Sequence, residues 1–233
     1  MFVLNRTRWI IFSIIAVGIL VLLVISSGNN GLNVSNVNVN AIQTANSQNG
    51  QIADHVFGKV GSKVTLIQYG DFQCPPCGEM YPIVKAITTK YVNQLQFVFR
   101  NFPISQLHPN ATAAAATAEA AGLQGQYWQM HNKLYDTQSE WSDLSISDRS
   151  KFFDNLASEL GLNLKKFDMD TSSTAVSDKI NYDIAIGTKA TVNATPTFFL
   201  NGKKLSSDQY GTESAFENTI NTDLTQAGIA LPK

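Results

Sequence analysis

Residues 63–77 read KVTLIQYGDFQCPPC, and the order of elements along the chain can be built outward from them. The segment Lys63–Tyr69 is short, rich in β-branched side chains and followed by Gly70, which is typical of a buried strand. The only two cysteines, Cys74 and Cys77, come directly afterwards. Behind them, apolar residues recur at spacings of three and four, which indicates an amphipathic helix. The sequence therefore predicts that the cysteine pair joins the end of a strand to the start of a helix.

A cysteine pair separated by two residues can be half of a zinc site, a structural bridge or a redox pair. Zinc would need two further Cys or His ligands, and the three histidines are scattered singly along the chain. A structural bridge would close so short a loop that it would restrict the unfolded chain very little. The redox interpretation has the strongest physical basis, and it requires neither a metal nor an organic cofactor.

The predicted helix start gives the two sulfurs different roles. Disulfide exchange needs a thiolate, which the unpaired N–H groups and the dipole of a helix N-terminus stabilise. We expect Cys74 at the N-cap to be the exposed sulfur with a lowered pKa, and Cys77 to be its buried partner. Pro75 takes the first helical position, where proline is favoured. Pro76 removes another N–H donor, so we hypothesise that the double proline reduces the oxidising power of the pair.

Strand patterns recur on either side of a long helical region. Leu95–Arg100 is predicted to be a second strand, and Pro82 is expected to kink the helix that precedes it. Near the other end, Thr197–Leu200 and Lys203–Leu205 flank Asn201-Gly202, which is the strongest local signal of a β-hairpin. These segments predict one mixed sheet assembled from both ends of the folded part.

Residues 107–185 carry helical patterns and are expected to form an inserted lobe. The first helix of the lobe is rich in alanine, and Asn110 is expected to be its N-cap. The predicted helices of this region are Ala111–Ala121, Gln126–Tyr135, Ser147–Leu160 and Asp178–Thr188. Outside the lobe, a closing helix is predicted from Glu213 to about Gly228.

Every residue from Trp9 to Ala53 is uncharged. Residues 9–25 are apolar enough to span a bilayer as a helix, and Arg6 and Arg8 before them place the N-terminus in the cytoplasm by the positive-inside rule. A cleavable signal peptide is the alternative, although no clean cleavage site follows. Both interpretations export the remainder. Residues 26–51 are rich in Asn, Ser and Gly and are predicted to be a flexible linker.

Three separated stretches carry a resemblance to a known family. They are residues 63–77 followed by Pro82, residues 102–132, and residues 194–198, which read ATPTF. Together they resemble a DsbA-type thiol-disulfide oxidoreductase of the thioredoxin-like superfamily, particularly the membrane-anchored kind. The resemblance covers about residues 52 to 230, and the three motifs occur in the family's order.

The resemblance implies an α/β thioredoxin fold with an inserted helical domain, preceded by a transmembrane helix and a flexible linker. It implies a cis peptide bond between Thr195 and Pro196 that faces the cysteine pair, where the backbone of residue 195 would pair with the substrate chain. Without the cysteine motif, Pro196 would be interpreted as a proline at a strand edge. The expected segments are a cytoplasmic tail (1–8), an anchor (9–25), a linker (26–51), a thioredoxin-like domain (52–106 and 186–233) and a helical lobe (107–185).

Two residues near the motif are candidates for tuning the redox pair. Where the family often carries a buried Glu that shuttles the proton of the inner cysteine, this chain has Gln68, whose amide cannot titrate. The alternative is that Gln68 satisfies a buried hydrogen bond. Asp71 could tune the surroundings of Cys74, or it could be a turn or capping carboxylate.

These features predict an exported, membrane-tethered enzyme that introduces disulfide bonds into reduced exported proteins through Cys74 and Cys77. The resemblance implies that a quinone-linked membrane protein reoxidises the pair. With 17 Lys and Arg against 18 Asp and Glu, the net charge of −1 argues against a nucleic-acid partner. A disulfide reductase or isomerase on the same fold remains an alternative, as does a non-catalytic binding or chaperone module.

Overall fold

The computed structural model describes residues 32–232 and divides the chain into two units, residues 1–33 and 34–233. The predicted cytoplasmic tail, the predicted anchor at 9–25 and the first part of the predicted linker lie outside the described residues. Within residues 32–232, no helix is both long enough and apolar enough to cross a membrane. The following description concerns the second unit.

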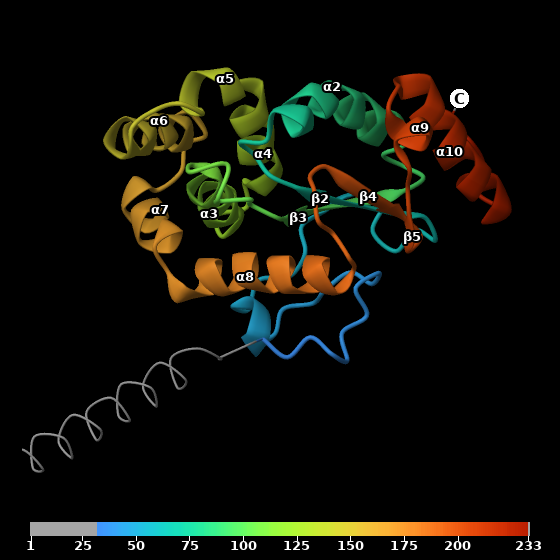
Figure 1. The fold of residues 1–233 in the computed structure, drawn as a ribbon, viewed down its shortest axis with the longest axis horizontal. Coiled ribbons are helices and arrows are strands. Elements are labelled where there is room, and N and C mark those ends of the chain that lie inside the picture. The colour runs from blue at the N-terminus through green and yellow to red at the C-terminus, as the bar shows by residue number, and fades with distance from the viewer. Residues whose placement is uncertain (1–31, 233) are drawn as a thin grey trace, which may run out of the picture. The chain divides into compact units, whose positions relative to one another are not determined.

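A mixed sheet of five strands forms the centre of this unit (Figure 1). The strands are β1 (Val56–Gly58), β2 (Thr65–Gly70), β3 (Gln96–Asn101), β4 (Thr197–Leu200) and β5 (Lys203–Lys204). They lie in the order β1-β3-β2-β4-β5, with β2 and β3 parallel and the other neighbours antiparallel. Helices α2 (Pro75–Lys90) and α10 (Glu213–Gln226) cover one face and α8 (Thr174–Lys189) the other, so the central strands are buried on both sides.

The predicted strands are all present, with ends that differ from the prediction by at most two residues. β1 is not predicted from the sequence, because three residues are too few to show a period. The helix behind the cysteines continues past Pro82 and forms one element from residue 75 to residue 90. Its first two positions hold Pro75 and Pro76, where missing N–H groups cost no helical hydrogen bond.

The expected helical insertion lies between β3 and β4, and it is larger than the sequence pattern suggests. Its elements are α3 (Ala111–Gly122), α4 (Tyr127–Asp136), α5 (Gln138–Trp141), α6 (Ile146–Glu159), α7 (Leu164–Thr171) and α8, and the chain ends with α9 (Ser207–Tyr210) and α10. The alanine side chains of α3 are mostly buried, which allows α4 and α7 to pack closely against it. The predicted boundary between residues 185 and 186 falls inside α8, because this helix packs against both α3 and β3.

Residues 34–51 are ordered, so the prediction of a flexible linker is wrong for this part. A short 3-10 helix, η1 (Ser47–Asn49), packs against α8, and Asn49 is fully buried. The guanidinium of Arg100 donates hydrogen bonds to two backbone carbonyls of the segment, and Lys189 Nζ donates to three. The segment buries little apolar surface, but these two cations satisfy its backbone carbonyls. Composition alone could not predict these hydrogen bonds.

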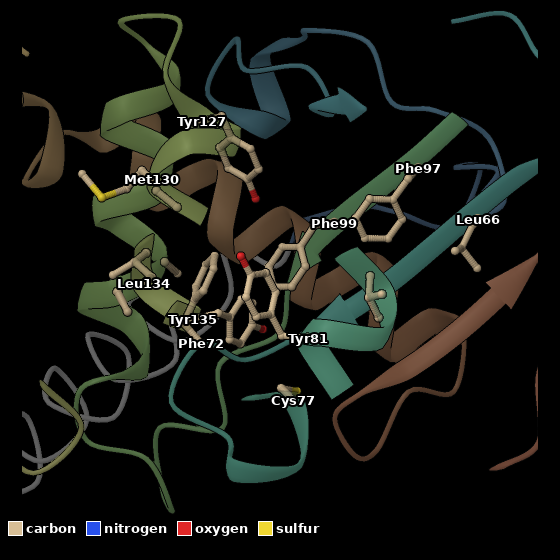
Figure 2. Packing of buried hydrophobic residues seen from close by; sticks show 14 of the residues in the cluster. Leu66, Phe72, Cys77, Tyr81, Phe97, Phe99, Tyr127, Met130, Leu134 and Tyr135 are labelled. Carbon is tan, nitrogen blue, oxygen red and sulfur yellow. The ribbon is translucent and has the colours of Figure 1, made fainter. Parts of the chain in front are cut away.

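Aromatic side chains join the insertion to the sheet. Phe72, Tyr81, Phe99 and Tyr135 form one buried group, and Cys77 lies at its edge (Figure 2). The ring centroids of Phe72 and Phe99 are 4.9 Å apart, and those of Tyr81 and Tyr135 are 5.1 Å apart. Burial of such rings contributes strongly to stability, so the inner cysteine lies beside a buried aromatic cluster.

Candidate redox site

Cys74 is the N-cap of α2, and its backbone is bonded on both sides. Its N–H donates to the Asp71 carbonyl at 3.2 Å, and its carbonyl accepts the N–H groups of Cys77 at 3.0 Å and Gly78 at 3.2 Å. Both cysteines are free thiols. Cys74 retains only 5% of its accessible surface, so the expectation of an exposed sulfur is wrong. The surrounding loops cover it in the dithiol form.

The two thiols ionise very differently. A hydrogen bond from the Cys77 thiol, helped by the Thr195 hydroxyl and the Cys77 N–H, lowers the pKa of Cys74 to about 6 against the opposing effects of burial and Asp71. Burial raises the pKa of Cys77 well above its ordinary value, and the neighbouring Cys74 adds to this shift. Cys74 is therefore the thiolate at neutral pH and Cys77 stays protonated, as the position of the pair at the helix start predicts.

The loop before β4 reaches the cysteine pair. The peptide bond between Thr195 and Pro196 is cis, as the family resemblance implies. The Cys74 thiol donates to the Thr195 carbonyl at 3.3 Å. Thr195 Oγ1 is buried and makes no hydrogen bond within the described part of the chain, yet it lies close enough to both sulfurs to lower the pKa of each. This hydroxyl is thus placed to donate to a thiolate.

Asp71 holds the loop that leads to Cys74. Its Oδ1 accepts the Gln73 N–H at 2.8 Å, while its Oδ2 accepts the Ile104 N–H at 2.9 Å and lies 2.6 Å from His108 Nδ1. The carboxylate is therefore a turn residue, and its charge also opposes ionisation of Cys74. Both roles considered for Asp71 have support in these contacts.

Gln68 lies in β2 and is 2% exposed. Both interpretations of Gln68, the missing proton shuttle and the buried hydrogen bond, stay predictions. Among residues 32–232, no group of three or more His, Cys, Asp or Glu side chains could hold a metal ion.

Three polar side chains around the loop before Cys74 make hydrogen bonds that the sequence does not predict. Gln138 Nε2 donates to the carbonyls of Phe72 at 2.7 Å and Cys74 at 3.0 Å. Gln73 accepts the Asn110 N–H at 2.6 Å and donates to the Ser142 carbonyl. Asn110 does precede α3, but its side chain makes no capping bond and instead donates to carbonyls of residues 141–144. No motif marks these amides, because their partners lie far away in the sequence.

Comparisons with known proteins agree with this geometry. A family model described as Thioredoxin matches residues 51–222. Among solved structures, alpha-DsbA1 of Wolbachia pipientis has a TM-score of 0.66 at 21% identity, covering 75% of this chain and 92% of that one. BdbD of Bacillus subtilis has a TM-score of 0.65 at 21% identity, covering 79% and 98%. MdbA of Corynebacterium diphtheriae, a thiol-disulfide oxidoreductase, has 0.56 at 20%, covering 84% and 98%.

Curated relatives match the same region within much longer proteins. The Na(+)/H(+) antiporter NhaA 1 of Mycolicibacterium gilvum is 35% identical over 155 residues, and that of Salinispora arenicola is 36% identical over 151. The match covers 65% of this chain in each case but only 24% and 22% of the relatives. The matched region, the sheet order and the strand–Cys-x-x-Cys–helix junction lead to one conclusion: the chain belongs to the thioredoxin family, with the fold of the DsbA-type thiol-disulfide oxidoreductases.

Proposed function

We propose that this protein is a membrane-tethered thiol-disulfide oxidoreductase that introduces disulfide bonds into exported proteins through Cys74 and Cys77. One observation carries the proposal. The pKa of Cys74 is lowered to about 6 by its contacts at the start of α2, while burial keeps the adjacent Cys77 protonated. A low pKa makes Cys74 a good leaving group and stabilises the reduced form of the pair, and both effects favour the oxidation of other thiols.

The reaction starts from the oxidised pair. A substrate thiolate attacks the sulfur of Cys74, forming a mixed disulfide, and the electron pair of the broken bond goes to Cys77, which takes up a proton. A second substrate thiolate then attacks the substrate sulfur of the mixed disulfide and releases Cys74 as a thiolate. The substrate loses two electrons and gains a disulfide, and the enzyme becomes the dithiol. The raised pKa of Cys77 supports its role as the sulfur that is protonated in the first step.

Thr195 and Pro196 form the proposed substrate-binding loop. The Thr195 carbonyl lies 3.3 Å from the sulfur of Cys74, which supports a position beside the mixed disulfide. An extended substrate chain that pairs with the backbone of residue 195 would place its own cysteine next to Cys74.

Export and membrane attachment belong to the same proposal. The apolar segment 9–25 behind Arg6 and Arg8 supports a single-pass anchor in the cell membrane, with the N-terminus in the cytoplasm and the catalytic part outside. Since the reaction leaves the pair reduced, an oxidant must regenerate it, and we propose a quinone-linked membrane protein. The region matched in this chain also occurs within proteins named as antiporters, which supports the proposal that this protein acts at a membrane.

The activity can be tested by refolding reduced ribonuclease A in a buffer that contains no oxidised glutathione. The preoxidised enzyme is then the only oxidant. We expect the wild-type protein to restore ribonuclease activity and Cys74→Ser to be inactive. Equal activity of the two proteins would exclude dithiol catalysis and favour a chaperone module.

The alternative of a reductase or isomerase is separated by the redox potential. Titration against glutathione should give a potential of about −120 to −200 mV for an oxidase. A value below about −250 mV would contradict the proposed direction, because the pair would then be held as the dithiol.

A further inference from the structure

Gln138 reaches from the helical insertion to the first residue of the redox pair. It is the first residue of α5, and its Nε2 donates to the carbonyl oxygens of Phe72 at 2.7 Å and Cys74 at 3.0 Å. The two carbonyls belong to the loop between β2 and α2. One side chain therefore binds the backbone at two points, at Cys74 itself and two residues before it.

The carbonyl of Cys74 is the point where three donors converge. The N–H groups of Cys77 and Gly78 begin the helix there, and the Gln138 amide is the third donor. Because Pro75 and Pro76 have no N–H, this first turn holds fewer backbone donors than an ordinary helix start. The amide of Gln138 adds a further donor to the Cys74 carbonyl from outside the helix.

Gly78 keeps the space that the Gln138 side chain occupies. A Cβ at position 78 would overlap Gln138 Oε1 and lie 2.8 Å from Cδ. The backbone of Gly78 is helical, so its conformation does not require glycine. A residue with a Cβ at this position would have to displace the Gln138 amide.

We infer that Gln138 is a positioning residue of the redox site, which fixes the peptide plane of Cys74 and thereby aims its thiol at Cys77 and the Thr195 loop. This inference rests on the proposed exchange function and names the contact by which the insertion acts on it. Gln138 touches no reacting sulfur in the structure; it acts through the Cys74 carbonyl.

A change of Gln138 therefore has a specific consequence. Without the amide, the Cys74 carbonyl keeps only the two N–H donors of its own helix, and we expect its sulfur to spend time away from the groups that stabilise the thiolate. In Gln138→Ala we expect the pKa of Cys74 to rise by about one unit from about 6. The rate of alkylation by iodoacetamide at pH 6 should fall by a factor of about five and stay unchanged at pH 9, because the thiolate fraction alone changes.

The control is Ser139→Ala on the same helix. Ser139 is exposed and neighbours Gln138, so this variant should keep the wild-type alkylation profile. Thermal unfolding of each variant shows whether it is folded at the temperature of the assay. A shift in the pH profile of a folded variant cannot come from a general loss of stability.

Gly78→Ala tests the same contact from the other side. The new methyl group should displace the Gln138 amide and raise the pKa of Cys74 as Gln138→Ala does. In the Gln138→Ala background, Gly78→Ala should leave the alkylation rate at pH 6 unchanged, because the displaced group is already gone.

Two results would overturn the inference. The first is an alkylation profile of folded Gln138→Ala that matches the wild type. The second is an effect of Gly78→Ala that is equal with and without Gln138. Failure of the proposed function looks different, since the wild-type protein itself would then not oxidise reduced ribonuclease A.

Discussion

Replacing Thr195 by valine removes one hydroxyl beside the cysteine pair and keeps the shape of the side chain. In the dithiol form Thr195 Oγ1 is buried and has no hydrogen-bond partner among the described residues. The same hydroxyl contributes to lowering the pKa of Cys74. Valine should therefore leave the dithiol fold as stable as before, or slightly more stable, while the thiolate loses a donor.

The size of the effect follows from one hydrogen bond to a charged group, which contributes about 1.5 to 3 kcal/mol. Since one pKa unit corresponds to about 1.4 kcal/mol, the pKa of Cys74 should rise by about one to two units from about 6. A lowered thiol pKa stabilises the reduced form once the pH exceeds that pKa. Raising it weakens the reduced form at every pH above about 6, so the potential should become more negative by about 20 to 30 mV at pH 7 and by about 30 to 60 mV above about pH 8.

Iodoacetamide alkylation measured against pH gives the pKa, and equilibration with glutathione gives the potential. Thr195→Ser is the matched control, because it keeps the hydroxyl and should stay close to the wild type in both measurements. A valine variant with the wild-type pKa would refute the reasoning. So would a serine variant that shifts as far as valine, because the lost methyl group would then be responsible.

Three further outcomes are expected. Asp54→Asn leaves Arg100 without its carboxylate and removes one of the two that bind Lys179, so it should destabilise the fold by about 3 to 5 kcal/mol in urea unfolding, whereas Asp136→Asn, at an exposed ion pair, should cost less than about 1 kcal/mol. Burial lowers the pKa of His131 to about 4, so the unfolded state binds more protons below about pH 6.5. Stability should fall by up to about 1.4 kcal/mol per pH unit between about pH 6.5 and 4, and His131→Leu should remove that contribution. Lys189→Met should make residues 34–37 more susceptible to limited proteolysis at unchanged Cys74 reactivity, and an unchanged digestion pattern would contradict the role of this lysine.

The sheet and most helices are predictable because their signals are local. Thr65–Gly70 reads as a buried strand from its β-branched run, and the turn at Asn201-Gly202 follows from residues that tolerate positive φ. The division of roles between Cys74 and Cys77 is also predicted from their positions at the first turn of a helix, although the distant Thr195 helps to lower the pKa of Cys74. Features that depend on neighbouring residues in the sequence, such as strands and turns, are therefore predicted well.

The errors arise where a distant side chain changes the outcome. Residues 34–51 look like a solvated linker, but Arg100 in β3 and Lys189 in α8 bind their carbonyls. Gln138 carries no motif and becomes part of the site only because α5 lies against the loop before Cys74. The exposure of Cys74 is misjudged for the same reason, since segments far away in the sequence cover it.

The first turn of α2 links these observations to the chemistry. Helix N-termini stabilise thiolates through free N–H groups, but Pro75 and Pro76 supply none, and the N–H groups of Cys77 and Gly78 donate to the Cys74 carbonyl. The lowered pKa of Cys74 therefore depends first on the Cys77 thiol, and then on the Thr195 hydroxyl more than on the Cys77 N–H. A thiolate stabilised by side chains depends on how its sulfur is oriented, because a thiol and a hydroxyl donate along one direction each. That dependence is the reason why a residue that only orients the Cys74 backbone can alter the redox chemistry of the pair.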